Sequence, residues 1–278
     1  MILLLPPSET KRDGGDASRV LDLGVLSFQE LSQHRRKTLA ALTTVSRSVK
    51  TANAALKLGP KQGFEIERNR SIRRSPIMPA IERYTGVLYD ALEADSLSEE
   101  VRRFAGRSVV VHSALFGLLG ANDPIPAYRL SHDSRLPGLS LRTHWRDVTA
   151  RALSSKEDFV IDLRSEAYAA LGPRPERSTY IRVVTETADG ARLAVSHFNK
   201  KAKGEFTRAV LSAGIVHTSA NSLVEWARDR GIRLEPGSGN RNGHGYGNGK
   251  GAGAGAVAGE LDLVVAEESA SVRQQPLK

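Results

Sequence analysis

The sequence predicts a mixed α/β fold in which a central mixed sheet is surrounded by helices. Three observations lead to this prediction. Short apolar runs typical of buried strands recur along the chain, and segments with apolar residues at helical spacing lie between them. Two of the runs alternate apolar and polar residues around a hairpin signal, so the sheet cannot be wholly parallel. Helices that alternate with strands cover the faces of such a sheet.

The strand predictions begin at the N-terminus. Residues 2–5 form an apolar run that Pro6 and Pro7 close abruptly. Residues 188–190, Ala-Asp-Gly, are the turn of the predicted hairpin. The other runs of strand character are residues 107–112, 158–163, 180–187, 191–197 and 260–266.

Helical spacing is clearest over residues 34–58, where one face carries an apolar residue every three or four positions. Ser46 is a good N-cap residue and would divide this stretch into two helices with a tight connection. Ser222 and Glu225 have the spacing of a capping box, and Gly231 is suited to end the helix that follows. Further helices are predicted at residues 80–92, 144–153 and 200–211.

Residues 236–259 interrupt this pattern, because ten of these 24 residues are Gly and almost none is a large apolar residue. Such a segment cannot bury enough surface to offset the entropy of ordering it. We therefore expect a single domain formed by residues 1–235 and 260–268, a flexible insertion at 236–259 and a disordered tail at 269–278. The alternative is a Gly-rich nucleic-acid-binding segment, since the stretch contains Arg241, His244, Tyr246 and Lys250.

The net charge of +9 is concentrated in one segment. Residues 35–74 contain eleven Lys and Arg against two acids, Glu65 and Glu67, so this segment carries the whole net charge. A concentrated positive field favours a polyanion partner, because Lys and Arg release the counterions of phosphates. The alternative is a solvated helix face. On one continuous helix, four of the cations would share a sector roughly 80° wide: Arg36, Arg47, Lys50 and Lys57.

The composition excludes several classes of function. The chain has no Cys, which excludes disulfides, thiol nucleophiles and cysteine-held metal clusters and suits a reducing cytoplasm. The longest N-terminal apolar run, residues 1–7, is too short to span a bilayer or to act as a signal peptide. The seven His are not spaced with acids as metal ligands would be. We expect a cytoplasmic protein with no membrane contact, no metal site and no cofactor.

Common catalytic motifs such as the phosphate-binding loop and the nucleophile elbow are absent from the sequence. Three polar constellations remain. Residues 7–11 follow the first strand and residues 162–166 follow the third, where a ligand at the carboxyl edge of a sheet would lie. Residues 197–204 contain three Lys at a helix start, which can bind a phosphate, although such a start is more often a solvated surface.

Arg129 is a separate candidate. Pro124 and Pro126 hold the preceding chain extended and can direct Arg129 towards a fixed anion. The alternative is a structural ion pair with an acid.

Six stretches, taken together, resemble the YaaA peroxide-stress family and especially its actinobacterial branch. They occur in family order: LLPPSETK (4–11), IERYTGVLYDAL (81–92), RSVVVHSALFGLLGANDPIPAYRLS (107–131), VIDLRSEAYAAL (160–171), SHFNKKAKG (196–204) and ELDLVV (260–265). Two departures stand out. Thr10 replaces a Gly of the branch, and residues 120–124 lack an Arg-Pro that many members have.

The resemblance implies a cytoplasmic protein that limits peroxide damage by lowering free intracellular iron. It also implies a fold peculiar to the family, with a helix-hairpin-helix-like element and a basic cleft that binds DNA. Residues 39–58 match that element in pattern, and the segment that carries the net charge includes them.

The leading hypothesis is a monomeric stress protein that binds DNA without sequence preference. Its binding residues would be Arg36, Arg47, Lys50, Lys57, Lys61, Arg73 and Arg74. The second hypothesis is an enzyme for a small phosphate-bearing or nucleotide-like substrate, with Glu9 or Asp162 as general base and Lys200 as a further catalytic candidate. Its pocket would hold Ser8, Lys11, Arg129, Arg164, Ser165, Asn199 and Lys203. A scaffold without a ligand is the third hypothesis, and the sequence leaves open whether any reaction is catalysed.

Overall fold

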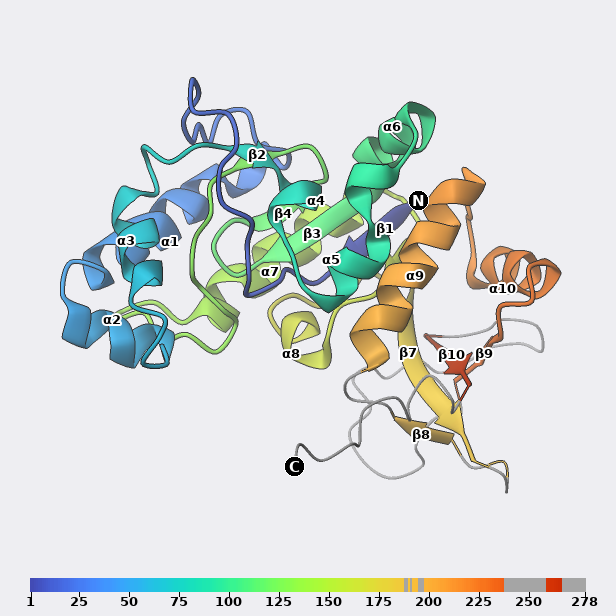
Figure 1. Ribbon diagram of the computed structural model, residues 1–278. Coiled ribbons are helices and arrows are strands. Elements are labelled where there is room, and N and C mark those ends of the chain that lie inside the picture. The colour runs from blue at the N-terminus through green and yellow to red at the C-terminus, as the bar shows by residue number, and fades with distance from the viewer. Residues whose placement is uncertain (188–189, 191, 195–197, 238–258, 267–278) are drawn as a thin grey trace, which may run out of the picture.

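A mixed sheet crosses the molecule in the strand order β4-β3-β1-β6-β7-β10-β9, with β8 paired to β7 (Figure 1). The computed structural model describes residues 1–187, 190, 192–194, 198–237 and 259–266. The mixed α/β prediction is confirmed. The strands of this sheet are β1 (Ile2–Leu5), β3 (Val109–Ser113), β4 (Gly117–Gly120), β6 (Val160–Asp162), β7 (Ser178–Glu186), β8 (Arg192–Ala194), β9 (Leu234–Pro236) and β10 (Glu260–Val265).

Five neighbouring strands, β3, β1, β6, β7 and β10, run parallel. All four residues of β1 are buried, as expected for a strand covered on both faces of a parallel sheet. The edge strands β4 and β9 and the short strand β8 are antiparallel. The parallel strands therefore end at one common edge, where residues 6–11 leave β1 and residues 163–166 leave β6.

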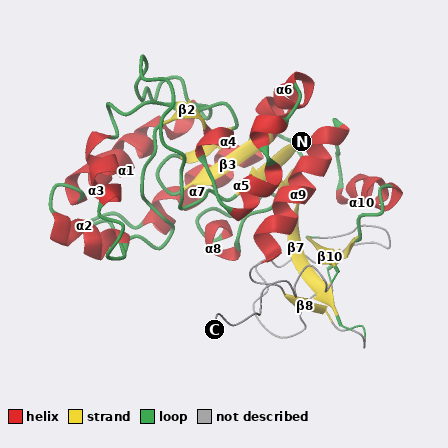
Figure 2. Ribbon diagram, viewed as in Figure 1, coloured by secondary structure: helices red, strands yellow, loops and turns green. Residues whose placement is uncertain are grey.

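Helices cover the sheet and form a separate lobe at one end (Figure 2). The helices α1–α3 lie at the left of the view, and β8 lies at the opposite end of the molecule (Figure 1). Two short strands, β2 (Met78–Pro79) and β5 (Pro124–Ile125), form a second small sheet. The helices are α1 (Ser32–Val45), α2 (Val49–Leu56), α3 (Phe64–Ser71), α4 (Ala80–Arg83), α5 (Val87–Leu92), α6 (Glu99–Ser108), α7 (Leu141–Ser154), α8 (Glu166–Ala169), α9 (Phe198–Ala213) and α10 (Ala220–Asp229), with 3₁₀ turns η1 (Gln29–Leu31) and η2 (Ala94–Ser96).

The stretch of residues 34–58 is two helices, as predicted, but its cap is not the predicted one. The Ser46 hydroxyl donates back to the Leu42 carbonyl at 2.8 Å and so belongs to the end of α1. Ser48 caps α2 instead, its Oγ accepting from the Thr51 amide at 3.5 Å. The helix break places Arg47 in the connection and Lys57 at the left-handed C-cap, with φ of 53°. The 80° sector predicted from one continuous helix therefore does not exist, and the helix-hairpin-helix geometry stays a prediction.

Two other helix predictions need correction. Residues 80–92 form two helices, because the chain turns at residues 84–86 and Gly86 has φ of 96°. The cap of α10 is Ser219, whose Oγ accepts from the Ser222 amide at 3.2 Å, so the predicted capping box begins three residues late. Gly231 follows the end of α10 with φ of 67°, as predicted for a C-terminal stop.

The predicted Gly-rich insertion and C-terminal tail lie almost wholly outside the described residues. At the borders of the insertion, Pro236 ends β9, and the Gly259 carbonyl accepts from the Tyr180 amide at 3.0 Å. None of the helices in the described ranges is long and apolar enough to cross a membrane.

Candidate functional site

Ionisable side chains from four segments gather at the carboxyl edge of β1 and β6. We call Glu9, Lys11, Arg129, Arg164 and Lys203 the edge cluster. Glu9 and Lys11 follow β1, Arg164 follows β6, and α9 contributes Lys203. Four of the five are buried, and only Glu9 is exposed. The structure thus brings together residues that are up to 194 positions apart in the sequence.

Lys11 is buried against aromatic rings. Its Nζ donates to the carbonyls of Ser8 at 2.9 Å and Glu9 at 3.2 Å. It also lies 4.2 Å from the centre of the Tyr128 ring, an attractive cation–π contact. Burial lowers the pKa of Lys11 to about 7, although the nearby Glu65 carboxylate opposes this shift. Lys11 can therefore gain or lose a proton near neutral pH.

The Tyr128 hydroxyl lies 2.7 Å from the Tyr84 hydroxyl and 2.7 Å from Ser113 Oγ. Burial raises the pKa of Tyr128 to about 12, so this hydroxyl keeps its proton at neutral pH. The ring beside Lys11 is therefore uncharged and joined to the end of β3 through Ser113.

Arg129 reaches the same place from the loop after β5. Its Nη2 lies 2.9 Å from Glu9 Oε2, so the ion pair that was the alternative interpretation of Arg129 is present. Its main chain is held independently by Asn69 of α3, which accepts from the Arg129 amide at 2.8 Å and donates to its carbonyl at 2.9 Å. The buried Arg129 Nε has no hydrogen-bond partner among the described residues.

Asp162 and Arg164 form an internal pair with neither side chain exposed. Arg164 donates to both carboxylate oxygens of Asp162, from Nε at 2.9 Å and from Nη2 at 2.7 Å. Its Nη1 lies 2.7 Å from His112 Nδ1. Burial and the Arg164 charge hold the pKa of His112 well below its usual range, so His112 is neutral and its Nδ1 accepts this hydrogen bond. Because Arg164 occupies its carboxylate, Asp162 acts here as an anchor for Arg164.

Lys203 closes the cluster from α9. Its Nζ donates to the Arg164 carbonyl at 2.9 Å and lies 4.9 Å from the Tyr180 ring centre. Burial lowers the pKa of Lys203 to about 8. Lys200, one turn earlier, is exposed, and Asn199 is half-buried.

Ser8 and Ser165 have local roles. Ser8 Oγ lies 3.2 Å from the Thr10 hydroxyl, and Ser165 Oγ caps α8 by accepting from the Tyr168 amide at 3.4 Å. His112 and Tyr168 were not predicted as site residues, although both lie inside the stretches that carry the family resemblance. Burial raises the pKa of Tyr168, and the nearby Tyr128 and Glu9 raise it further, so Tyr168 lies beside the edge cluster.

We expect replacement of Lys11 with Met to change the pH dependence of stability. The Lys11 pKa rises from about 7 in the fold to 10.5 in the unfolded chain, so unfolding takes up a proton between these values. The wild type should therefore gain stability relative to Lys11→Met as pH rises from about 7 to 9.5, by at most about 1.4 kcal/mol per pH unit. Urea unfolding at several pH values measures this difference. Lys50→Met, at an exposed position, is the control, and parallel curves for wild type and Lys11→Met would contradict the assignment.

The second candidate site is the lobe of α1–α3. Every predicted DNA-binding residue on it is exposed. We call this set the basic lobe: Arg36, Arg47, Lys50, Lys57, Lys61, Arg73 and Arg74. Lys57 pairs with Asp133 at 2.7 Å. The other six make no ion pair with any residue that the structure describes.

The two acids of the charged segment are occupied by other arginines. Glu65 pairs with Arg68 at 3.2 Å, and Glu67 pairs with Arg70. Arg70 also donates to the carbonyls of Ser46 at 2.7 Å and Arg47 at 2.9 Å, which joins α3 to the α1–α2 connection. Glu65 and Glu67 therefore do not offset the charge of the basic lobe.

Helix α7 contacts α1 and brings a further cation near it. His144 Nε2 of α7 lies 3.0 Å from Thr38 Oγ1 and 3.1 Å from the His34 carbonyl of α1. Burial lowers the pKa of His34, and the charges of Lys37 and Arg151 lower it further, so both cations lie near this helix contact. Arg151 was missed because it is distant in sequence from residues 35–74.

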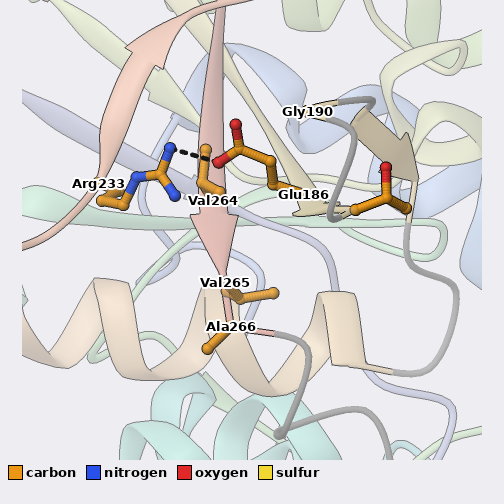
Figure 3. A pocket seen from close by; sticks show the side chains of 7 residues that line it. Glu186, Gly190, Arg233, Val264, Val265 and Ala266 are labelled. Carbon is orange, nitrogen blue, oxygen red and sulfur yellow. Dashed lines mark ion pairs between the residues drawn. The ribbon is translucent and has the colours of Figure 1, made fainter.

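Two cavities are lined by residues that belong to neither candidate site. One, of about 460 Å³, is at the ends of β7 and β10, where Arg233 pairs with Glu186 at 2.6 Å and Val264 forms part of the wall (Figure 3). The other, of about 300 Å³, is lined by Asp16, Ile77 and Pro124 among others. Neither cavity is lined by a predicted site residue. Within the described ranges, no group of three or more His, Cys, Asp or Glu could hold a metal ion.

Comparison with known proteins places both candidate sites inside a matched region. Residues 1–233 match the family described as "Peroxide stress protein YaaA". A UPF0246 protein of Corynebacterium efficiens is 39% identical over 246 residues, covering 87% of this chain and 97% of the relative. A UPF0246 protein of Streptomyces coelicolor is 38% identical over 249 residues, covering 87% and 95%. An uncharacterized protein of Campylobacter jejuni is 24% identical over 208 residues, covering 73% and 82%.

Proposed function

Since this chain belongs to the YaaA family of peroxide stress proteins, we propose that it serves the peroxide-stress response by binding DNA through its basic lobe. The observation that carries the proposal is the exposed positive charge of six basic-lobe residues that form no ion pair within the described part of the chain. Six cations of the lobe lack an ion pair with the described residues, and the acids of the segment are held by Arg68 and Arg70. Unpaired surface cations are what a phosphate backbone neutralises.

Binding of this kind is electrostatic and has little sequence preference. Lys and Arg contacts to phosphates position a protein on the duplex without reading bases. The main-chain amides at the start of α2, beside Lys50, would add to the attraction because a helix N-terminus carries partial positive charge. DNA binding by the basic lobe would take place in the cytoplasm.

Family membership supports a second part of the proposal, that the protein limits free intracellular iron during peroxide stress. Lower free iron reduces the damage that peroxide causes to DNA, so both parts protect the same target. Measuring chelatable iron in peroxide-treated cells with and without the protein tests this part. Equal iron levels in the two kinds of cell would contradict a role in limiting iron.

Two single substitutions test the DNA-binding part on a matched pair of lysines. Lys50 has no ion pair with a described residue, whereas Lys57 is paired with Asp133. Lys50→Gln should therefore lower the slope of log affinity against log salt by about one unit, and Lys57→Gln should lower it by less. Fluorescence anisotropy with a labelled duplex at several salt concentrations measures both slopes. If both variants keep the salt slope of the wild type, DNA binding at α2 is contradicted.

A further inference from the structure

The edge cluster occupies the position at which open α/β sheets bind ligands. From β1 the chain proceeds to β3 on one side, and from β6 it proceeds to β7 on the other side. The strand order therefore reverses between β1 and β6, and a crevice at the carboxyl ends of such a strand pair is the usual ligand position. Residues 6–11 and 163–166 both leave the sheet there. The side chains decide what could bind.

Buried positive charge exceeds buried negative charge at this edge. Lys11, Arg129 and Lys203 are all buried, whereas the buried carboxylates Asp162 and Glu65 are paired with Arg164 and Arg68. The two lysines donate hydrogen bonds to main-chain carbonyls, and neither forms an ion pair with a described residue. A charge kept from water is stabilised by an opposite charge, so this edge favours an anion.

Arg129 provides the specific contact. Its side chain is only 8% exposed, whereas the Glu9 side chain that pairs with it is 60% exposed. Glu9 thus reaches Arg129 from the solvent side. It contacts Nη2, while Nε of the same guanidinium has no partner among the described residues. A phosphate or carboxylate can accept from two guanidinium nitrogens at once, and Glu9 uses one.

Arg129 does not depend on Glu9 for its position. Asn69 holds the main chain of Arg129 through two hydrogen bonds. If Glu9 moved away, Arg129 would remain beside Lys11, whose pKa responds to the Arg129 charge. A phosphate that replaced Glu9 would meet the Arg129 guanidinium and the Lys11 amine, and its negative charge would favour the protonated form of Lys11.

We propose that Arg129 and Lys11 bind the phosphate group of a small ligand, and that Glu9 occupies this site until the ligand displaces it. Glu9 supplies in the free protein the negative charge that the phosphate supplies in the complex. The carboxylate competes with the ligand, so its removal strengthens binding. This site is separate from the basic lobe and from DNA binding.

Isothermal titration calorimetry with inorganic phosphate tests the proposal without DNA. Glu9→Gln should bind phosphate at least about fivefold more tightly than the wild type, because the competing charge is gone. Arg129→Lys should bind at least about tenfold more weakly, because a lysine cannot form the two-nitrogen contact. Thermal unfolding of each variant establishes that it is folded.

Asp95→Asn is the matched control for Glu9→Gln. Asp95 is 57% exposed and pairs at 2.8 Å with Arg12, which is itself exposed. Its replacement removes the same charge from a surface pair and should leave phosphate affinity within about twofold of the wild type. Equal effects of Glu9→Gln and Asp95→Asn, or no phosphate binding by Glu9→Gln, would overturn the proposal.

A further variant separates this site from the basic lobe. Lys50→Gln should bind phosphate as the wild type does, even if it binds DNA more weakly. Loss of phosphate binding in Lys50→Gln would place the anion on the basic lobe and overturn the edge site. If the wild-type protein binds phosphate but does not bind DNA, the edge site is supported and only the proposed DNA binding is removed.

Discussion

Reversing three charges on the basic lobe should lower affinity for duplex DNA by at least about tenfold. The variant replaces Arg47, Lys50 and Arg74 with Glu. Lys57 is left unchanged, because its pairing with Asp133 already offsets its charge. The salt slope should fall by roughly one unit for each phosphate that the variant no longer neutralises. Electrophoretic mobility shift and anisotropy titrations measure affinity and slope.

Folding of this variant should be close to that of the wild type, because the three side chains are exposed and unpaired within the described structure. A matched control reverses three exposed cations at the other side of the molecule, Arg103 and Arg107 of α6 and Arg228 of α10 (Figure 1). Both variants lower the net charge by six. An equal loss of DNA affinity in the two would mean that only net charge matters and would remove the basic lobe as a site.

The largest loss of stability is expected from Arg35→Met. Arg35 belongs to the charged segment but is fully buried. It donates to the carbonyls of Phe116 at 2.9 Å and Leu118 at 2.7 Å, and also to that of Ser27. Methionine fills a similar volume but leaves these carbonyls without their donor, so the free energy of unfolding should fall by at least about 3 kcal/mol. Urea unfolding followed by circular dichroism measures the change.

The neighbouring residue provides the control for this prediction. Arg36 is exposed and has no ion pair among the described residues, so Arg36→Met should change stability by no more than about 0.5 kcal/mol. The two variants make the same chemical replacement one position apart. Equal stabilities would show that the buried hydrogen bonds of Arg35 do not stabilise the fold.

The difference between Arg35 and Arg36 shows what a local sequence pattern cannot predict. The count of eleven cations in residues 35–74 treats both residues alike. Burial lowers the pKa of Arg35 to about 10, so it stays charged at neutral pH inside the protein. Its acceptors on Phe116 and Leu118 are 81 and 83 residues away, beyond the reach of any local pattern.

The break between α1 and α2 has a similar explanation. Apolar spacing continues through residues 34–58, so periodicity alone favours one helix. Two local hydrogen bonds end α1 and begin α2, through the hydroxyls of Ser46 and Ser48. Arg70 then binds the carbonyls of Ser46 and Arg47 from α3. A serine can end one helix or cap the next, and the hydrogen bonds from Arg70 of α3 stabilise the break at this position.

The sequence predicted some residues of the edge cluster but not how their side chains pair. Residues that follow β1 and β6 were expected at one edge, because parallel strands place their carboxyl ends together. Asp162 was a candidate base, whereas in the structure both of its oxygens accept from Arg164. The Glu9–Arg129 ion pair joins residues from separate loops that the fold brings within 2.9 Å.

Six stretches of sequence were enough to recognise the resemblance to the family. Residue types and their short-range spacing were enough to predict the mixed α/β class, the buried strands and the segment that carries the net charge. These properties can be inferred from one amino-acid sequence without knowledge of its fold. The folded arrangement was needed to show that Arg35 is internal, that Glu9 covers Arg129 and that Lys11 has a pKa of about 7. Burial and pairing depend on neighbours that distant segments supply. The free energy of a charged group depends on those neighbours and on its exclusion from water, so a local sequence pattern cannot predict it.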